Sequence, residues 1–279
     1  MPSADRNTEW GSSYRLNAAE TWTAKSARMG RDVTEALVDY ARPRAGMNIL
    51  DVASGTGEPA ITIASRMGAS GHITATDLNA DLLAIAAQRA KQRGFDRVTT
   101  QQADAQSLPF DDHTFDLATC RFGVMFFPDV QRALRELLRV LRPGARACFA
   151  VWGSREQPYF SASIGIVHRH MGGPLIASGG PDPFRFADAG SLSRALNEAG
   201  FASVHEETRI VPWTWPGTPE EVWGQQQAVV APFRALLDRV PAIDWPRLNE
   251  EIHSALRKYQ DGDELKFTAT IVLASGCKP

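Results

Sequence analysis

Apolar and polar positions alternate in blocks between residues 48 and 152. Five short apolar runs have the length of buried strands, at 48–53, 71–77, 98–103, 115–122 and 145–152. Three stretches with helical spacing lie among them, at 58–67, 80–93 and 130–141. Strands that alternate with helices of this length predict right-handed crossovers and a parallel sheet. The pattern therefore predicts a doubly wound α/β fold.

The flanking segments are expected to complete this sheet and to cover it. Helices are predicted at 18–40, 160–170 and 191–199, strands at 203–211 and 264–274, and helical segments within 218–260 that Pro232, Pro241 and Pro246 interrupt. We expect one domain with a seven-stranded, mostly parallel sheet. Its parts are a helical cap at 1–44, a binding core at 45–153, lid insertions at 154–187 and 212–263, and the segments 188–211 and 264–279 that complete the sheet. Ligands bind at the carboxyl edge of such sheets, where the lids would lie.

Composition narrows the class of protein. The 43% apolar and 9% aromatic content can fill a sizeable core. Thirty basic against 32 acidic side chains give a net charge of −2, which argues against nucleic-acid and anionic-membrane partners. No run approaches eighteen apolar residues, and the polar N-terminus shows no export signal. Three widely spaced cysteines do not favour disulfides or a zinc site. We therefore expect a cytoplasmic, globular protein.

A glycine-containing loop follows the first predicted strand. In Asp51-Val-Ala-Ser-Gly55-Thr-Gly57 the glycines allow a sharp turn and a close approach of a ligand to the backbone. The segment also fits a dinucleotide fingerprint loosely. However, Glu58 stands at the start of the next helix and Asp51 just before the loop, so a pyrophosphate would meet two negative charges. A cationic ligand suits these charges better, and S-adenosylmethionine carries a sulfonium and an ammonium group.

Two further acidic residues end the next two predicted strands. Asp77 ends the second strand, where a carboxylate can accept hydrogen bonds from both ribose hydroxyls. Asp104 ends the third, where a carboxylate could receive the amino group of adenine. Each residue alone is more simply explained as a cap or a turn residue. Together with Asp51, acids at three successive strand ends favour an adenosine-containing cofactor.

These residues belong to a set of motifs that resembles the class I S-adenosylmethionine-dependent methyltransferases, and among them the ubiquinone/menaquinone C-methyltransferase-like group. The motifs occur in the family's order at 49–59, 75–78, 103–105, 108–112, 115–116, 120–127 and 140–144. The resemblance covers 44–153 closely and 184–201 more loosely. This sequence has Ala53 and Ala145 where the family often has glycine, but it keeps Gly55 and Gly57.

The resemblance implies a role for each motif around the cofactor. Asp51 and the loop residues Ala53, Ser54, Gly55 and Gly57 would face the methionine part. Asp77 with Leu78 would hold the ribose, and Asp104 with Ala105 the adenine. Cys120 and Phe122 would line the pocket beside the sulfonium. Trp22, in the leading segment, would cover the cofactor, unless it merely packs on the sheet. The product of the cofactor would be S-adenosylhomocysteine.

The sequence leaves the catalytic groups open. A base is needed only where the nucleophile carries a proton of high pKa, as a phenol or an aromatic carbon does. His168, His170 and Tyr159 are candidate bases in the first lid, and Arg121 could instead stabilise a phenolate. The two histidines are two positions apart on a predicted helix, so they cannot share one ligand face, and we expect no metal. Cys120 could approach the methyl, although a buried inert thiol is the simpler interpretation.

Three other groups of residues have simpler structural interpretations. Trp213, Trp215, Trp223 and Trp245 fit core packing, with an aromatic pocket for a flat substrate as the alternative. The segment 111–113 fits a polar turn. The basic positions of the helix at 130–141 fit a solvated face, namely Arg132, Arg135 and Arg139.

The function expected from these features is methyl transfer to O, N or C of a small hydrophobic or aromatic metabolite, such as a quinone precursor or a natural-product intermediate. The protein would align the acceptor with the carbon–sulfur bond and exclude water. The alternatives are a dinucleotide-dependent oxidoreductase and a non-catalytic relative that only binds S-adenosylmethionine. Methylation of nucleic acid or protein is disfavoured because there is no basic surplus. Whether the protein forms a homodimer stays open.

Overall fold

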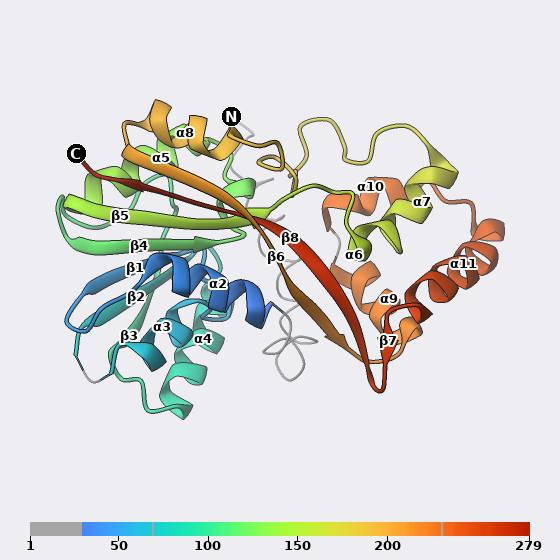
Figure 1. Ribbon diagram of the computed structural model, residues 1–279, viewed down its shortest axis with the longest axis horizontal. Helices are drawn as coiled ribbons and strands as arrows, with labels where there is room; N and C mark the ends of the chain where they lie inside the picture. Colours follow the sequence, from blue (N-terminus) through green and yellow to red (C-terminus); the bar gives the residue numbers. More distant parts are fainter. Residues whose placement is uncertain (1–29, 69, 230) are drawn as a thin grey trace. The chain divides into compact units, whose positions relative to one another are not determined.

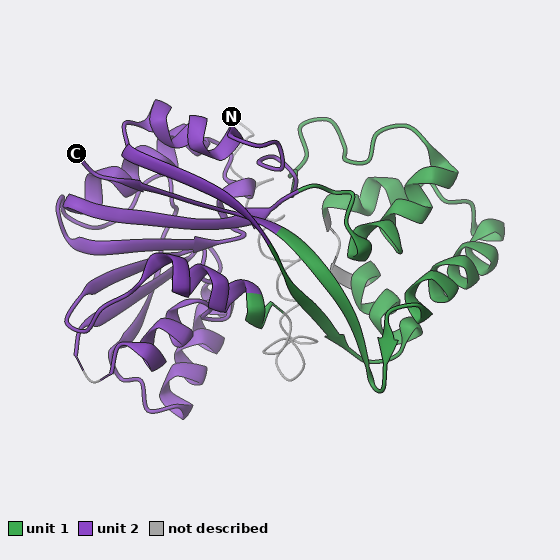
Figure 2. Ribbon diagram, in the orientation of Figure 1, with its two compact units in different colours: residues 1–32, 154–183, 210–270 green, residues 33–153, 184–209, 271–279 purple. Residues whose placement is uncertain are grey.

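The computed structural model describes residues 30–68, 70–229 and 231–279, and these form two compact units (Figure 2). Unit 2 comprises 33–153, 184–209 and 271–279, and unit 1 comprises 154–183 and 210–270 with the described residues before Val33. Each unit is therefore assembled from segments that are far apart in the sequence.

A single sheet forms the centre of unit 2, in the order β3-β2-β1-β4-β5-β8-β6 (Figure 1). The strands are β1 (Asn48–Val52), β2 (His72–Asp77), β3 (Val98–Gln102), β4 (Phe115–Arg121), β5 (Leu141–Trp152), β6 (Ala202–Pro216) and β8 (Glu264–Cys277). The pairs from β3 to β5 are parallel, and β8 is antiparallel to β5. The two-residue β7 (Gln260–Asp261) pairs with β8. The expected doubly wound, mostly parallel sheet of seven main strands is confirmed.

The strand order reverses between β1 and β4, because the chain moves outward from β1 to β3 and then returns to the other side of β1. In doubly wound sheets this switch point opens a crevice at the carboxyl ends of the strands. The loops that follow β1 and β4 therefore mark the place where a ligand is expected.

The helices of unit 2 are α2 (Arg31–Ala41), which belongs to it from Val33 onward, α3 (Ala60–Arg66), α4 (Ala80–Gln92), η1 (Val124–Phe126), α5 (Val130–Val140) and α8 (Ser191–Ala199). Side-chain caps fix two of the helix starts. Asn79 accepts hydrogen bonds from the backbone N–H groups of Asp81 and Leu82, and Asp129 accepts one from that of Arg132. The buried face of α5 has helical spacing, with Val130, Ala133, Leu134 and Leu137.

Unit 1 contains α6 (Pro158–Ser161), α7 (Ile164–Met171), α9 (Pro219–Val229), η2 (Ala231–Phe233), α10 (Arg234–Leu237), η3 (Ala242–Asp244) and α11 (Trp245–Arg257). Its core is aromatic. The ring of Tyr159 stacks on that of Trp215 at 5.4 Å between centroids and meets the rings of Trp213 and Phe267 edge-on, both at 5.8 Å. Trp223 is also buried. Core packing therefore accounts for these three tryptophans.

Some elements differ from the sequence prediction. The helix expected at 160–170 is two helices, because the chain breaks at Ser163, whose φ and ψ are −132° and −99° and whose hydroxyl donates to the Tyr159 carbonyl. Pro246 does not interrupt α11, since it occupies the first turn, where a missing N–H is tolerated. Of the helix expected at 18–40, the part before residue 30 lies outside the described residues. In the described part of the chain, no helix has the length and apolar character needed to cross a membrane.

Candidate cofactor site at the carboxyl ends of β1, β2 and β4

The loop after β1 is held against the end of β2 by its own backbone. The Ser54 N–H donates to the Thr76 carbonyl at 2.9 Å, and the Gly57 N–H donates to the Ser54 carbonyl at 2.9 Å. The Asp77 carboxylate accepts from the Gly55 N–H at 3.0 Å through one oxygen and from the Asn79 N–H at 3.0 Å through the other. Asp77 therefore braces the loop, and its role toward a ribose stays a prediction.

The two glycines of the loop have different tasks. Both have positive φ, +55° at Gly55 and +103° at Gly57. A Cβ at Gly57 would lie 2.8 Å from Ile61 Cδ1 and 3.1 Å from Ala86 Cβ, so this glycine lets the loop pack on α3 and α4. A Cβ at Gly55 would meet no atom of the described chain within 4 Å. None of the described residues therefore occupies the space beside Gly55.

Two features of this edge match an adenosine-containing cofactor. Ser54 is 3% exposed, yet its hydroxyl has no hydrogen-bond partner among the described residues. Leu78 directly follows the strand-end Asp77 and is 48% exposed, which is unusual for a large apolar side chain in this protein. A ligand with polar groups at the loop and an apolar ring over Leu78 would satisfy both. The residues present therefore fit S-adenosylmethionine.

Asp51 supplies a buried carboxylate beneath the loop. It has no exposed surface, and its oxygens accept hydrogen bonds from the Thr119 hydroxyl at 2.8 Å and the Ala60 N–H at 3.2 Å. Burial raises the pKa of Asp51 to about 7, against the lowering effect of these two hydrogen bonds. A cationic ligand would favour the ionised form. Thr119 has no sequence signal of its own, and only the parallel register of β1 and β4 sets it opposite Asp51.

The negative charge of Glu58 is neutralised by an ion pair within the protein. One carboxylate oxygen of Glu58 lies 3.1 Å from Arg89 Nη2, and the other accepts from the Thr62 hydroxyl at 2.7 Å. Arg89 also donates to the Thr56 carbonyl at 2.5 Å, so it clamps the loop from α4. This corrects the sequence argument. Glu58 belongs to an ion pair that fixes the loop, and a role of Asp51 toward a cation stays a prediction.

At the end of β3 the structure supports the simpler interpretation of Asp104 as a turn residue. Its carboxylate accepts from the Gln106 N–H at 2.9 Å and from the Gln106 side-chain amide at 3.1 Å. The next residue, Ala105, is buried. A contact of either residue with adenine stays a prediction.

The end of β4 brings three predicted residues to the same sheet edge. Cys120 is fully buried, and Phe122 stacks on Trp152 with 4.4 Å between ring centroids. Arg121, the last residue of β4, donates through Nη1 to the Thr34 hydroxyl at 2.9 Å. Burial lowers the pKa of Arg121, and the charges of Glu58 and Asp51 oppose this shift. A guanidinium stays charged at neutral pH, so Arg121 can stabilise an anion but cannot accept a proton.

The other catalytic candidates all belong to unit 1. His168 and His170 lie on α7, where His168 Nε2 is 3.0 Å from the Gly173 carbonyl oxygen and His170 Nε2 is 2.7 Å from a Glu251 carboxylate oxygen. Tyr159 is buried in the aromatic core. The described residues contain no group of three His, Cys, Asp or Glu side chains placed to hold a metal ion. Trp22 lies outside the described residues.

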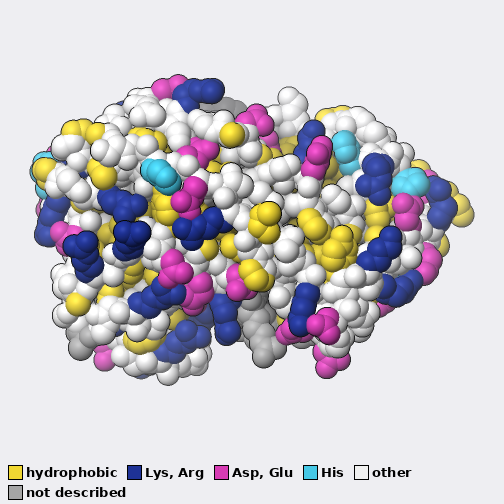
Figure 3. Space-filling model, in the orientation of Figure 1, with side chains coloured by type: hydrophobic (Ala, Val, Ile, Leu, Met, Phe, Trp, Pro, Cys, Tyr) yellow, Lys and Arg dark blue, Asp and Glu magenta, His cyan; other side chains and the backbone are white. Residues whose placement is uncertain are grey.

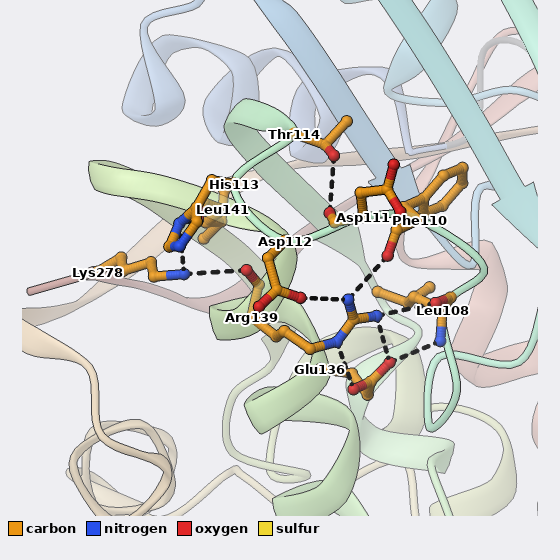
Figure 4. Close-up of polar contacts among 10 residues, drawn as sticks. All are labelled: Leu108, Phe110, Asp111, Asp112, His113, Thr114, Glu136, Arg139, Leu141 and Lys278. Carbon is orange, nitrogen blue, oxygen red and sulfur yellow. Dashed lines mark hydrogen bonds and ion pairs between the residues drawn. The ribbon is translucent and has the colours of Figure 1, made fainter.

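A second polar cluster of unit 2 joins the segment 111–113 to α5. The structure has a turn at Asp112 and His113, as predicted, whereas Arg139, which was expected on a solvated face, reaches from α5 across the loop after β3 (Figure 4). Its guanidinium donates to Glu136 and Asp112 and to the carbonyls of Leu108 and Phe110, at 2.8–2.9 Å. Hydrogen bonds from Arg139 hold the pKa of Glu136 below its ordinary value. This side chain therefore ties the loop to α5.

Comparison with known proteins identifies the family to which the chain belongs. The sequence profile of the ubiE/COQ5 methyltransferase family matches residues 24–171, which is more than half of the chain. The chain belongs to this family. Membership confirms the expected fold class and class of enzyme, with S-adenosylmethionine as the cofactor of the family.

The curated relatives carry the name ubiquinone/menaquinone biosynthesis C-methyltransferase. The chain is 42% identical to that of Idiomarina loihiensis over 110 residues, which are 39% of this chain and 44% of that protein. It is 33% identical to that of Bartonella quintana over 193 residues, 64% of this chain and 74% of that protein. The chain thus aligns with less than half the length of the first relative and about three quarters of the second.

Solved structures share the fold. The YcgJ protein of Bacillus subtilis has a TM-score of 0.58 at 21% identity, covering 88% of this chain and 97% of that one. The [4+2]-cyclase SpnF has a TM-score of 0.53 at 25% identity, covering 88% of this chain and 79% of that one. The name of SpnF shows that the fold also serves a reaction other than methyl transfer.

Proposed function

We propose that this protein transfers the methyl group of S-adenosylmethionine to a ring carbon of a small aromatic acceptor, a reduced quinone precursor. The observation that carries the proposal is the loop at the end of β1 in a chain of the ubiE/COQ5 family. Among the described residues, Gly55 has no neighbour within 4 Å of an added Cβ and the Ser54 hydroxyl has no hydrogen-bond partner. The names of the relatives support carbon over oxygen or nitrogen as the acceptor atom.

The chain's own groups orient and hold the cofactor. S-adenosylmethionine supplies an already activated methyl group on a sulfonium. Asp51 provides negative charge beneath the loop, and Ser54 offers an unused hydroxyl. Leu78 offers an apolar surface next to Asp77. Most of the rate then comes from alignment and exclusion of water, a contribution of about 7–11 kcal/mol in well-oriented reactions.

Among the polar candidates, we assign Arg121 to the oxygen of the acceptor. A ring carbon becomes nucleophilic when the hydroxyl on the ring ionises, so a fixed positive charge beside that oxygen lowers the barrier. Arg121 is held by Thr34 and keeps its charge at neutral pH. His168, His170 and Tyr159 stay alternatives for removal of the ring proton.

The experiment uses S-adenosylmethionine with a heavy-isotope methyl group. The purified chain is incubated with a 1,4-naphthoquinol that carries a short isoprenoid tail and, separately, with a metabolite extract. We expect label on a ring carbon of the quinol. Asp77→Ala should weaken cofactor binding about 10- to 100-fold, because it removes charge-assisted hydrogen bonds. Label only on oxygen or nitrogen of another metabolite would overturn the proposed acceptor.

A second candidate is a relative that binds S-adenosylmethionine without transferring its methyl group, as the fold shared with a cyclase suggests. It predicts intact cofactor binding and no labelled product in either incubation. Macromolecular acceptors receive no support from the face of the protein in Figure 3, where basic and acidic side chains are interspersed.

A further inference from the structure

An arginine of α4 holds the loop after β1 at two places. Arg89 donates through Nη1 to the Thr56 carbonyl at 2.5 Å, and the same nitrogen lies 3.2 Å from the Thr56 hydroxyl oxygen. Its Nη2 lies 3.1 Å from a Glu58 carboxylate oxygen. The two charged side chains are 18% and 15% exposed, so salt screens this pair less than a surface pair. A guanidinium can make both contacts at once, because its nitrogens form a rigid fork.

The strand that precedes α4 holds the same loop from its other end. The Asp77 carboxylate accepts from the Gly55 N–H at 3.0 Å, and the Thr76 carbonyl accepts from the Ser54 N–H at 2.9 Å. Asp77 also accepts from the N–H of Asn79, the residue that caps α4. One continuous segment, from the end of β2 through α4, therefore supports the loop on two sides.

The conformation of the loop explains why it needs such supports. Ala53 and Gly55 both have a φ of +55°, and Gly57 has a φ of +103°. A residue other than glycine adopts a positive φ only where its surroundings impose it, and such residues concentrate at functional sites. The contacts from α4 and β2 supply these surroundings. The loop is thus held in an unfavourable conformation by side chains outside it.

We propose that Arg89 is a positioning residue for S-adenosylmethionine: it holds the loop 53–58 in the conformation that binds the cofactor, and it does not contact the cofactor itself. The inference rests on the part of the proposed function that puts the cofactor at this loop, and it does not depend on the acceptor. An ordered loop binds more tightly, because the cost of ordering it is not taken from the free energy of binding.

A role in charge compensation alone would predict a different result. In Arg89→Met the Glu58 carboxylate loses its partner, so a negative charge is left uncompensated near a cationic ligand. If Arg89 only neutralised Glu58, this variant would bind S-adenosylmethionine more tightly than the wild type. If Arg89 positions the loop, the variant binds more weakly. The sign of the change in affinity therefore separates the two roles.

The test uses the full-length wild type and the variants Arg89→Met, Arg89→Lys and Lys91→Met. Lys91→Met is the control, because it removes a positive charge from an exposed position of the same helix. Calorimetry measures the dissociation constant of S-adenosylmethionine. Hydrogen exchange of the ligand-free protein follows the hydrogen-bonded amides of Ser54, Gly55 and Gly57. Chemical denaturation shows that each variant is folded under these conditions.

We expect Arg89→Met to bind S-adenosylmethionine about tenfold more weakly than the wild type. Arg89→Lys should recover part of this loss and bind about two- to fivefold more weakly, because an ammonium group keeps the charge but lacks the fork. In Arg89→Met the three loop amides should exchange faster, while the amides of the central strands should not. Lys91→Met should match the wild type in both measurements.

The inference is overturned if Arg89→Met binds the cofactor as tightly as the wild type or more tightly, or if its loop amides exchange at the wild-type rate. Faster exchange with unchanged affinity would mean that Arg89 orders a loop at which the cofactor does not bind. If Arg89→Met does not fold, Arg89→Lys decides, and wild-type affinity in that variant would count against positioning. The isotope experiment tests methyl transfer separately, since it uses the wild type alone.

Discussion

At the scale of single residues, the two glycines of the loop after β1 differ in what an added side chain would meet. Gly55→Ala places a methyl group in open space, whereas the same change at Gly57 drives it to 2.8 Å from Ile61 Cδ1. Both changes carry the cost of a positive φ, about 1–2 kcal/mol. We therefore expect Gly57→Ala to destabilise the fold by an additional 1–3 kcal/mol or so.

For the affinity for S-adenosylmethionine we expect the opposite order, with the larger effect from Gly55→Ala. Gly55→Ala is expected to lose at least about tenfold in affinity for S-adenosylmethionine, because the methyl group takes up ligand space. Chemical denaturation and calorimetry measure the two quantities. Normal affinity in folded Gly55→Ala would mean that the open space over this loop is not the cofactor site.

Asp51 gives a prediction about pH. Its pKa of about 7 in the folded chain lies above the value of 3.8 for an exposed aspartate. The folded state therefore binds this proton more tightly than the unfolded state, and the resulting stability is lost as the pH rises from about 4 through 7. Asp51→Asn removes the titration. Without cofactor, the variant should gain stability relative to the wild type between pH 5 and about 8.

Cofactor binding should show the converse dependence. Only the ionised form of Asp51 attracts the cation, so the affinity of the wild type should rise as the pH increases through about 7. Asp51→Asn should bind more weakly and lack this rise. Parallel pH profiles for the two proteins would remove Asp51 from the site.

At the scale of elements, Arg139 fixes the loop after β3 to α5. Arg139→Met should destabilise the chain by about 1–3 kcal/mol at neutral pH, since it leaves the Leu108 and Phe110 carbonyls and Glu136 without their donor. The pKa of Glu136 is lowered in the folded state, so this stability is present above about pH 4.5 and is lost as the pH falls further. Arg135→Met, at an exposed position of the same helix, is the control and should be nearly neutral.

The sequence predicted the elements of unit 2 well and those of unit 1 less well, for physical reasons. The strands at the sheet centre and the Asn79 and Asp129 caps are encoded locally by apolar runs and cap residues. The hydrogen bond from Thr119 to Asp51 depends on strand register, which no local pattern specifies. The Arg89 clamp on the loop likewise joins residues more than thirty positions apart.

Other features could not be predicted, because a sequence pattern does not show which polar side chains have hydrogen-bond partners in the folded protein. Gln225, Gln226 and Gln227 form an uninterrupted run in the sequence, yet the structure singles out the middle one as buried and unpaired. Arg139 resembles Arg132 and Arg135 in helical position, but it faces the loop rather than the solvent. Tertiary context decides both cases.

At the scale of the whole molecule, the two units share two strands. β6 and β8 each begin in one unit and end in the other, since the divisions fall at residues 209/210 and 270/271. When such a strand unfolds in one unit, the part of the same strand in the other unit loses its support. We therefore expect cooperative unfolding of both units, although the candidate cofactor site belongs to unit 2 alone.

Tryptophan positions make this testable. Trp213, Trp215, Trp223 and Trp245 belong to unit 1, so their fluorescence reports largely on that unit, while far-UV circular dichroism reports on the whole chain. S-adenosylmethionine at 100 times its dissociation constant stabilises the folded state by about 2.7 kcal/mol, which corresponds to a rise in melting temperature of about 5–10 °C. Both signals should shift together by this amount. The expectation would be contradicted if the circular dichroism transition moved to higher temperature while the fluorescence transition did not. In that case the shared strands would not couple the units, and the helices of unit 1 would unfold independently of ligand binding in unit 2.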